Sequence, residues 1–242
     1  LLFMGVYMYK KQTRNFKGKN RKFSYCEKYN VVKRSRTFDG LRCLPRSWGC
    51  LQNFLDLNGE LNCVEIGSHE GQSATFFLKE ILKNKDSKLT CVDPWIKSHW
   101  LKRDPTGLCY EDIFDLNMKL NDRYKQVKKF SGLNSDYYKT KEFKIQQFDI
   151  AYIDDIHTYE STCLNIKELY PQVIEGGIMI FDDYDCEYCD PTDKNAGPQW
   201  TEPVKKAVDE FLEREKDNVE IIFQEYQIII RKKHNWTIVD HD

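Results

Sequence analysis

Residues 62–74 read NCVEIGSHEGQSA, and this stretch decides the predicted fold. An apolar run around the acidic Glu65 leads into a turn with Gly67 and Gly71, and apolar residues at helical spacing begin at Ala74. The pattern predicts a buried strand, a tight loop and a helix. In an open α/β sheet such a loop lies at the carboxyl end of its strand, where ligands bind. We therefore expect glycine backbone close to a ligand and helix N–H groups available to an anion.

The glycine spacing of this loop differs from that of a dinucleotide-binding loop, which follows G-x-G-x-x-G. Here Gly67 is followed by Ser68, so the second glycine is missing and the pattern is Glu-x-Gly-x-x-x-Gly-x-Ser. This pattern resembles the first motif of class I S-adenosylmethionine-dependent methyltransferases, in which the glycines pass under the methionine part of the cofactor. An ordinary strand-loop-helix unit is the alternative interpretation.

Strand and helix patterns alternate along the chain. Strands are expected at 61–66, 88–92, 126–130, 149–153, 177–181, 219–223 and 226–230, and helices at 47–57, 72–82, 111–124, 158–169 and 203–212. Alternation predicts a parallel sheet with helices on both faces, and the adjacent last two strands make one strand antiparallel. The predicted class is α/β, a Rossmann-like, seven-stranded, mostly parallel sheet with one antiparallel strand near the C-terminus. Pro203 is expected in the first turn of the last helix.

Charge divides the chain into two parts. The 242 residues have a formal net charge of −1, which argues against a polyanion binder as a whole. Residues 1–46, however, hold thirteen Lys and Arg against only Glu27 and Asp39. We expect 1–46 to be an irregular basic arm with at most one short helix, and 47–242 to be the methyltransferase domain. The arm either docks on the acidic domain or binds nucleic acid or a phosphorylated substrate.

Cysteine usage and hydropathy indicate the cellular environment. Nine cysteines are an odd number, and Cys63 and Cys91 lie in apolar strand patterns, so a reduced, cytoplasmic location is expected. Cys186 and Cys189 form a lone C-x-x-C pair without a second pair at zinc spacing. No apolar run approaches the roughly 18 residues of a membrane-spanning helix. The chain begins with Leu1, and we expect it to be part of a longer protein with an upstream domain.

Asp93 ends the second predicted strand. In a doubly wound sheet, an acid there can accept hydrogen bonds from both ribose hydroxyls of a nucleoside. The alternative is a carboxylate that caps the turn before Pro94. Trp95 either stacks on the adenine or packs under the loop.

Acidic residues also follow the fourth and fifth predicted strands. Asp154-Asp155-Ile156-His157 follows one strand and Asp182-Asp183-Tyr184 the next. Converging carboxylates repel one another unless a cation lies among them, and hard oxygen ligands suit Mg²⁺, Mn²⁺ or Ca²⁺. His157 would lie at the rim of the same cavity, and imidazole suits proton transfer near neutral pH. Helix-capping acids with a surface histidine are the alternative.

These two stretches, with Tyr-Glu-Ser-Thr at 159–162, resemble the cation-dependent O-methyltransferases. The pattern is most similar to the macrocin O-methyltransferase-like sugar methyltransferases and more distantly to the catechol and caffeoyl-CoA O-methyltransferases. The resemblance covers roughly residues 47–232. It implies metal ligands at Asp154, Asp182 and Asp183, catalysis by His157 as general base with Asp154, and cofactor contacts from Glu65, Gly67, Ser68, Gly71, Ser73, Asp93 and Asn134.

One departure from the family pattern leaves a ligand open. Where many relatives read Asp-Gly-x-His, this chain has Asp155 after Asp154, so either carboxylate could bind the metal. Strand alternation favours Asp154, because Tyr152 and Asp154 would share a face.

The resemblance implies an S-adenosylmethionine-dependent, Mg²⁺-dependent O-methyltransferase that acts on a hydroxyl of a sugar, a glycan or another vicinal-diol small molecule. The cation would lower the pKa of a hydroxyl and His157 would take its proton. One alternative is an RNA methyltransferase that uses the basic arm, although motifs for base methylation are missing and no nucleic-acid partner is expected. The other is an inactive binding module. Fusion to a glycosyltransferase and a homo-oligomer are compatible with the sequence.

Overall fold

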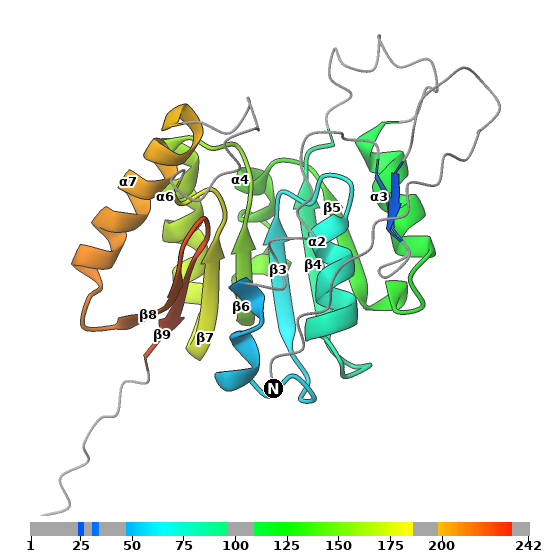
Figure 1. Cartoon of the computed structure of the whole chain (residues 1–242), viewed down its shortest axis with the longest axis horizontal. Coiled ribbons are helices and arrows are strands. Elements are labelled where there is room, and N and C mark those ends of the chain that lie inside the picture. The colour runs from blue at the N-terminus through cyan, green and yellow to red at the C-terminus, as the bar shows by residue number, and fades with distance from the viewer. Residues whose placement is uncertain (1–23, 27–30, 34–46, 96–108, 186–197, 234–242) are drawn as a thin grey trace, which may run out of the picture.

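The computed structural model describes residues 24–26, 31–33, 47–95, 109–185 and 198–233, with backbone alone for 24–26, 31–33 and 198–200. Seven strands form one sheet, in the order β5-β4-β3-β6-β7-β9-β8. They are β3 (Asn62–Ile66), β4 (Lys88–Asp93), β5 (Val127–Ser131), β6 (Phe148–Ile153), β7 (Val173–Phe181), β8 (Val219–Gln224) and β9 (Ile228–Lys232). The pairs from β5 to β7 are parallel, and β9 runs antiparallel to both of its neighbours, β7 and β8 (Figure 1). The predicted sheet is confirmed.

Helices cover both faces of the sheet (Figure 1). They are α2 (Gln72–Phe76), which continues as the π-helix η2 (Phe77–Ile81), α3 (Tyr110–Lys119), α4 (Asn134–Tyr137), α5 (Lys141–Ile145), α6 (Tyr159–Leu169) and α7 (Pro198–Arg214), with the 3₁₀ turns η1 (Leu51–Asn53), η4 (Tyr124–Gln126) and η5 (Tyr170–Gln172). Two apolar clusters result, one under α2 and α3 and the other under α4 to α7. Neighbouring strand residues alternate between them: Cys63 lies in the first cluster and Val64 in the second.

Two predicted helices are shorter in the structure. The helix expected over 47–57 is reduced to a short helical segment at its start and the 3₁₀ turn Leu51–Asn53. Helix α3 ends at Lys119, and Asn121 Oδ1 accepts the Arg123 N–H at 3.0 Å soon afterwards. A side chain that bonds backbone two residues on offers the chain a turn in place of a helix.

Other elements extend beyond the prediction. Helix α7 begins at Pro198, so Pro203 lies inside the helix and its placement in the first turn was wrong. A proline inside a helix loses one backbone hydrogen bond, which is why the pattern predicted a start there. Strand β7 begins at Val173, before the predicted start at 177. The added residues lie where the register between β6 and β7 shifts. The short α4 and α5 were not predicted, since neither is long enough to show an apolar period.

The basic arm contains regular structure where it is described. Strand β1 (Ser24–Cys26) pairs antiparallel with β2 (Val31–Lys33), and β2 lies beside α2 and α3 (Figure 1). The prediction of an irregular arm is therefore wrong for these residues. The rest of the arm and the pair Cys186 and Cys189 lie outside the described residues. In the part of the chain that the structure describes, no helix is both long and apolar enough to cross a membrane.

Gly67 fixes how the end of β3 meets the end of β6. Its φ is +90°, and its N–H donates to the Val92 carbonyl at 2.8 Å. A Cβ at this position would lie 1.7 Å from the carbonyl oxygen of Asp154. Only glycine allows the two backbones to come this close, so the loop after β3 and the acidic segment after β6 are held together.

Trp48 anchors the start of the domain. It is 1% exposed and packs against Phe77 and Tyr152, with ring centroids 4.6 and 4.9 Å away. We expect Trp48→Ala to lower the free energy of unfolding by about 3–5 kcal/mol, the usual range for a buried tryptophan. Urea unfolding measures this. The control Ile145→Ala, at a side chain 84% exposed, should change it by less than about 0.5 kcal/mol. Equal effects would show that Trp48 lies outside the core.

Gly67→Ala should destabilise the protein more than an ordinary glycine substitution. Strain at a left-handed φ and overpacking each cost about 1–3 kcal/mol, so a loss of about 3 kcal/mol or more is expected in urea unfolding. At Gly59 a Cβ would come no closer than 3.2 Å to a neighbouring atom. Gly59→Ala is therefore the matched control and should cost less. If the two variants were equally stable, the close approach of Gly67 to Asp154 would be refuted.

Candidate active site

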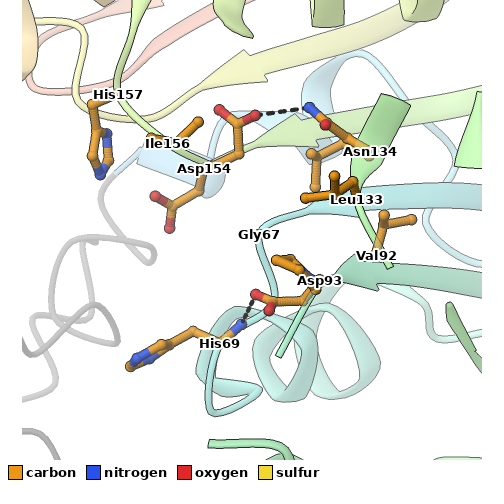
Figure 2. Close-up of a pocket in the computed structure, with 12 residues that line it drawn as sticks. Gly67, His69, Val92, Asp93, Leu133, Asn134, Asp154, Ile156 and His157 are labelled. Atoms are coloured by element: carbon orange, nitrogen blue, oxygen red, sulfur yellow. Dashed lines mark hydrogen bonds between the residues drawn. The ribbon is translucent and has the colours of Figure 1, made fainter. Parts of the chain in front are cut away.

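A cavity of about 490 Å³ opens at the carboxyl ends of β3, β4 and β6. Figure 2 shows Asp93 and His69 on one side of it and Asp154 and His157 on the other, with Gly67 between them. It is lined by Ile66, Gly67, His69, Val92, Asp93, Pro94, Leu133, Asn134, Asp154, Asp155, Ile156 and His157. The structure therefore brings Gly67, Asp93, Asn134, Asp154 and His157 together from the predicted site.

Glu65 lies behind the glycine loop. Its buried carboxylate accepts hydrogen bonds from the hydroxyls of Ser68, at 2.6 Å, and Ser73. Burial raises the pKa of Glu65, although these hydrogen bonds oppose the shift. Glu65, Ser68, Gly71 and Ser73 are not among the residues that line the cavity. Their contacts shape the loop instead.

Asp93, at the end of β4, binds the backbone of the glycine loop and of the turn that follows β4. One oxygen accepts the His69 N–H at 2.9 Å, shown as a dashed line in Figure 2, and the other accepts the Trp95 N–H at 2.7 Å. Each carboxylate oxygen can accept a second hydrogen bond, so Asp93 can cap the turn and still bind a hydroxyl. Trp95 is buried, donates to the His69 carbonyl at 2.8 Å and packs against Phe114 with ring centroids 4.8 Å apart. Trp95 therefore packs under the loop.

Three side chains converge on the other side of the cavity. Asp154, His157 and Asp183 offer ligand atoms that all lie within 4.8 Å of one another. His157 Nδ1 lies 2.6 Å from Asp183 Oδ2, and the Tyr152 hydroxyl donates to Asp154 at 3.1 Å. Asp183 has a φ of +53°, an uncommon conformation for a residue other than glycine. Nitrogen and carboxylate oxygens at this spacing can surround a small divalent cation.

Asp182 lies beside this group but faces a different partner. It is buried, and its Oδ1 accepts a hydrogen bond from Gln227 Nε2 at 2.6 Å. The group within 4.8 Å does not include it. Of the three expected ligands, Asp154 and Asp183 therefore lie in this group together with His157, and Asp182 lies outside it.

The acidic cluster carries unfavourable electrostatics. Burial and then the charges of Asp182 and Asp183 raise the pKa of Asp154 well above its usual range. Burial and the Asp183 charge raise the pKa of Asp182 to about 7. Burial lowers the pKa of His157, but its hydrogen bond to Asp183 and the nearby carboxylates outweigh this and raise it. A cation among these groups would relieve the repulsion between them.

Asp155 turns away from the cluster. Its Oδ2 accepts hydrogen bonds from Asn134 Nδ2 at 2.9 Å, Ser161 Oγ at 2.5 Å and Asn165 Nδ2 at 2.9 Å. These contacts tie the loop after β6 to α4 and α6. The geometry groups Asp154, and not Asp155, with Asp183, and it places Asn134 in the cavity through its bond to Asp155.

Sequence reasoning missed several residues of the site. His69 lines the cavity with a φ of +43°, and its ring lies 4.0 Å from that of Tyr110. Its position inside the glycine loop was a signal that could have been used. Leu133 and Ile156 line the cavity although they are 48% and 67% exposed. Nothing in the sequence indicated that Gln227 contacts Asp182, because the two residues are far apart in the chain.

Solved structures with the same fold include O-methyltransferases at low sequence identity. An O-methyltransferase from Bacillus cereus in complex with SAH has a TM-score of 0.54 at 18% identity, covering 75% of this chain and 79% of that chain. The methyltransferase MycE from the mycinamycin biosynthetic pathway, in complex with Mg, SAH and mycinamycin VI, has 0.54 at 15%, covering 84% and 53%. CalS11, a TDP-rhamnose 3'-O-methyltransferase of calicheamicin biosynthesis, has 0.51 at 16%, covering 79% and 79%.

A family model gives the assignment that these structures cannot give alone. No curated protein matches the chain significantly. The model described as a methyltransferase domain matches residues 64–184, which run from β3 through the acidic segment after β7. The match contains the glycine loop, Asp93 and the acidic cluster. The chain thus belongs to the methyltransferase-domain family, with the class I S-adenosylmethionine-dependent fold that its motifs resemble.

Proposed function

We propose that the protein is an S-adenosylmethionine-dependent O-methyltransferase that requires a divalent cation. The observation that carries the proposal is one cavity with two chemically different sides. A glycine loop and Asp93 form one side, and Asp154 and His157, with Asp183 close by, form the other. Such a cavity can hold a nucleoside cofactor next to an oxygen acceptor.

The proposed cofactor side combines close backbone approach with a hydroxyl acceptor. Gly67 places main chain at the cavity wall, and Asp93 would accept the ribose hydroxyls. Asn134 lines the same cavity and is the weaker candidate. The cofactor would be affected indirectly by four residues that hold the loop in shape: Glu65, Ser68, Gly71 and Ser73. In support, the hydroxyls of Ser68 and Ser73 donate hydrogen bonds to the Glu65 carboxylate.

The proposed metal side fits a hard cation. Asp154, Asp182 and Asp183 would be its ligands, because Mg²⁺, Mn²⁺ and Ca²⁺ prefer carboxylate oxygens. Burial and neighbouring carboxylates raise the pKa of Asp154 and of Asp182, and a cation would offset this repulsion. When bound, the cation would act as a Lewis acid that lowers the pKa of an acceptor hydroxyl. His157 would then take the proton, since its hydrogen bond to Asp183 makes it a stronger proton acceptor.

The proposed acceptor is a hydroxyl of a sugar or another vicinal diol, because two adjacent oxygens can bind one cation together. Support comes from the fold neighbours: one is a TDP-rhamnose 3'-O-methyltransferase, and another is described with Mg, SAH and mycinamycin VI. The exposed Leu133 and Ile156 at the cavity would contact an apolar part of the acceptor.

Metal removal separates this function from metal-free methyl transfer. EDTA should abolish turnover of a vicinal-diol acceptor, and Mg²⁺ or Mn²⁺ should restore it, while calorimetry still detects S-adenosylmethionine binding. Asp154→Asn should resemble EDTA treatment. Asp136→Asn is the control, since Asp136 pairs with Lys139 on the surface, away from the cavity lining. Full activity in EDTA would contradict the metal requirement, and no cofactor binding would contradict the methyltransferase itself.

His157→Ala tests the general base. Turnover should fall by roughly 10²–10⁴, the usual contribution of a positioned acid or base. Affinities for Mn²⁺ and for the cofactor should stay within about twofold, and raising the pH should recover part of the rate because hydroxide can replace the base. A large loss of Mn²⁺ affinity would instead make His157 a metal ligand and reject the base assignment.

A further inference from the structure

Gln227 lies in the turn between β8 and β9 and is 3% exposed. Its amide oxygen accepts hydrogen bonds from Ser47 Oγ at 2.5 Å and Trp48 Nε1 at 3.0 Å. Its amide nitrogen donates to Asp182 Oδ1 at 2.6 Å. One buried side chain therefore joins the start of the domain, the C-terminal hairpin and the acidic cluster.

The partners of Gln227 determine which way its amide points. An indole N–H can only donate, so the group that faces Trp48 must be the amide oxygen. The amide nitrogen then has to face Asp182. A flipped amide would place an oxygen against the carboxylate and a donor against the indole N–H, leaving buried polar groups unsatisfied.

The same hairpin turn also forms a hydrogen bond with the backbone that follows Asp182 and Asp183. The Tyr226 carbonyl accepts the N–H of Tyr184 at 2.8 Å. On the other side, the Asp182 N–H donates to the Ile153 carbonyl at 3.0 Å. Backbone and side chain of the Asp182–Asp183 segment are thus fixed from β6 and from the hairpin, and Gln227 supplies the side-chain contact.

We propose that Gln227 is a positioning residue for the cation site, which orients the Asp182 carboxylate by holding Oδ1 and so presents Oδ2 to the metal. This inference rests on the proposed function, since it assumes that Asp182 is a metal ligand. Outer groups that hydrogen-bond to ligating carboxylates typically set metal affinity by about 10–100-fold. Gln227 has the location, the burial and the fixed amide orientation that such a group needs.

The first test measures Mn²⁺ binding directly, by electron paramagnetic resonance of free Mn²⁺, so that no turnover is needed. Gln227→Met keeps the length of the side chain but removes both hydrogen-bonding groups. It should weaken Mn²⁺ binding about 10-fold or more, with S-adenosylmethionine affinity unchanged. Ser47→Ala is the matched control. Its Mn²⁺ affinity should equal that of the wild type, because Trp48 still fixes the amide. Wild-type Mn²⁺ affinity in Gln227→Met would overturn the proposal.

A second test does not require Gln227→Met to fold. Asp182→Asn should weaken Mn²⁺ binding strongly, because Gln227 would draw the new amide oxygen to itself and leave the amide nitrogen facing the cation. Adding Gln227→Glu reverses the polarity. The new carboxylate at position 227 would still accept from Ser47 and Trp48, and its other oxygen would accept from the amide nitrogen at position 182. The amide oxygen would then face the cation.

The double variant Asp182→Asn/Gln227→Glu should bind Mn²⁺ at least about 10-fold more tightly than Asp182→Asn alone. Equal affinities would mean that position 227 does not orient position 182, and the inference would be wrong. Failure of the proposed function looks different: wild-type protein would then bind no Mn²⁺, whatever residue stands at position 227. A purely structural role for Gln227 would change thermal unfolding in the variants without this recovery of binding.

Discussion

Repulsion among converging carboxylates is the constraint on which the rest of this site depends. Asp154, Asp182 and Asp183 come together because β6 and β7 are parallel neighbours that end at the same edge of the sheet. Burial and like charge raise the pKa of Asp154 and of Asp182, so the ionised state of these two side chains is disfavoured. The surrounding contacts hold it in place nonetheless: Tyr152 donates to Asp154, Gln227 to Asp182, and His157 contacts Asp183. The repulsion between these carboxylates is unfavourable without a cation and would be offset by a cation bound among them.

The central strands place the glycine loop after β3 and the Asp154 side chain at one cavity. Gly67 allows the loop after β3 to pass against the Asp154 carbonyl, a contact that a side chain would prevent. Asp93 then braces that loop through the N–H of His69. Asp155 ties the acidic segment to α4 and α6, so it stabilises the loop that carries Asp154 and His157. The two sides of the cavity are therefore coupled through backbone, and a methyl donor on one side would meet an oxygen nucleophile on the other.

Much of this arrangement could be predicted from the sequence. All seven strands of the main sheet were predicted. The signal was clearest for buried parallel strands such as β6, which appear as nearly continuous apolar runs. The acids were predicted as a group, because strand ends on one sheet edge converge. Strand alternation favoured Asp154 over Asp155 but left the choice open, since the contacts that turn Asp155 away come from Asn134 and Asn165, which are distant in the chain. The sequence could not reveal Gln227, whose role depends on how the hairpin folds back on Asp182, or the α7 start upstream of Pro203.

The most direct measurement is a crystal structure of the protein grown with SAH and Mn²⁺, with data collected near the manganese absorption edge. Our account predicts one strong anomalous peak beside Asp154 and Asp183, with carboxylate oxygens about 2.0–2.3 Å from the ion, and SAH beside Gly67 and Asp93. SAH bound in the cavity with no anomalous peak at the acids, or with a peak elsewhere on the protein, would contradict a cation site at this edge of the sheet.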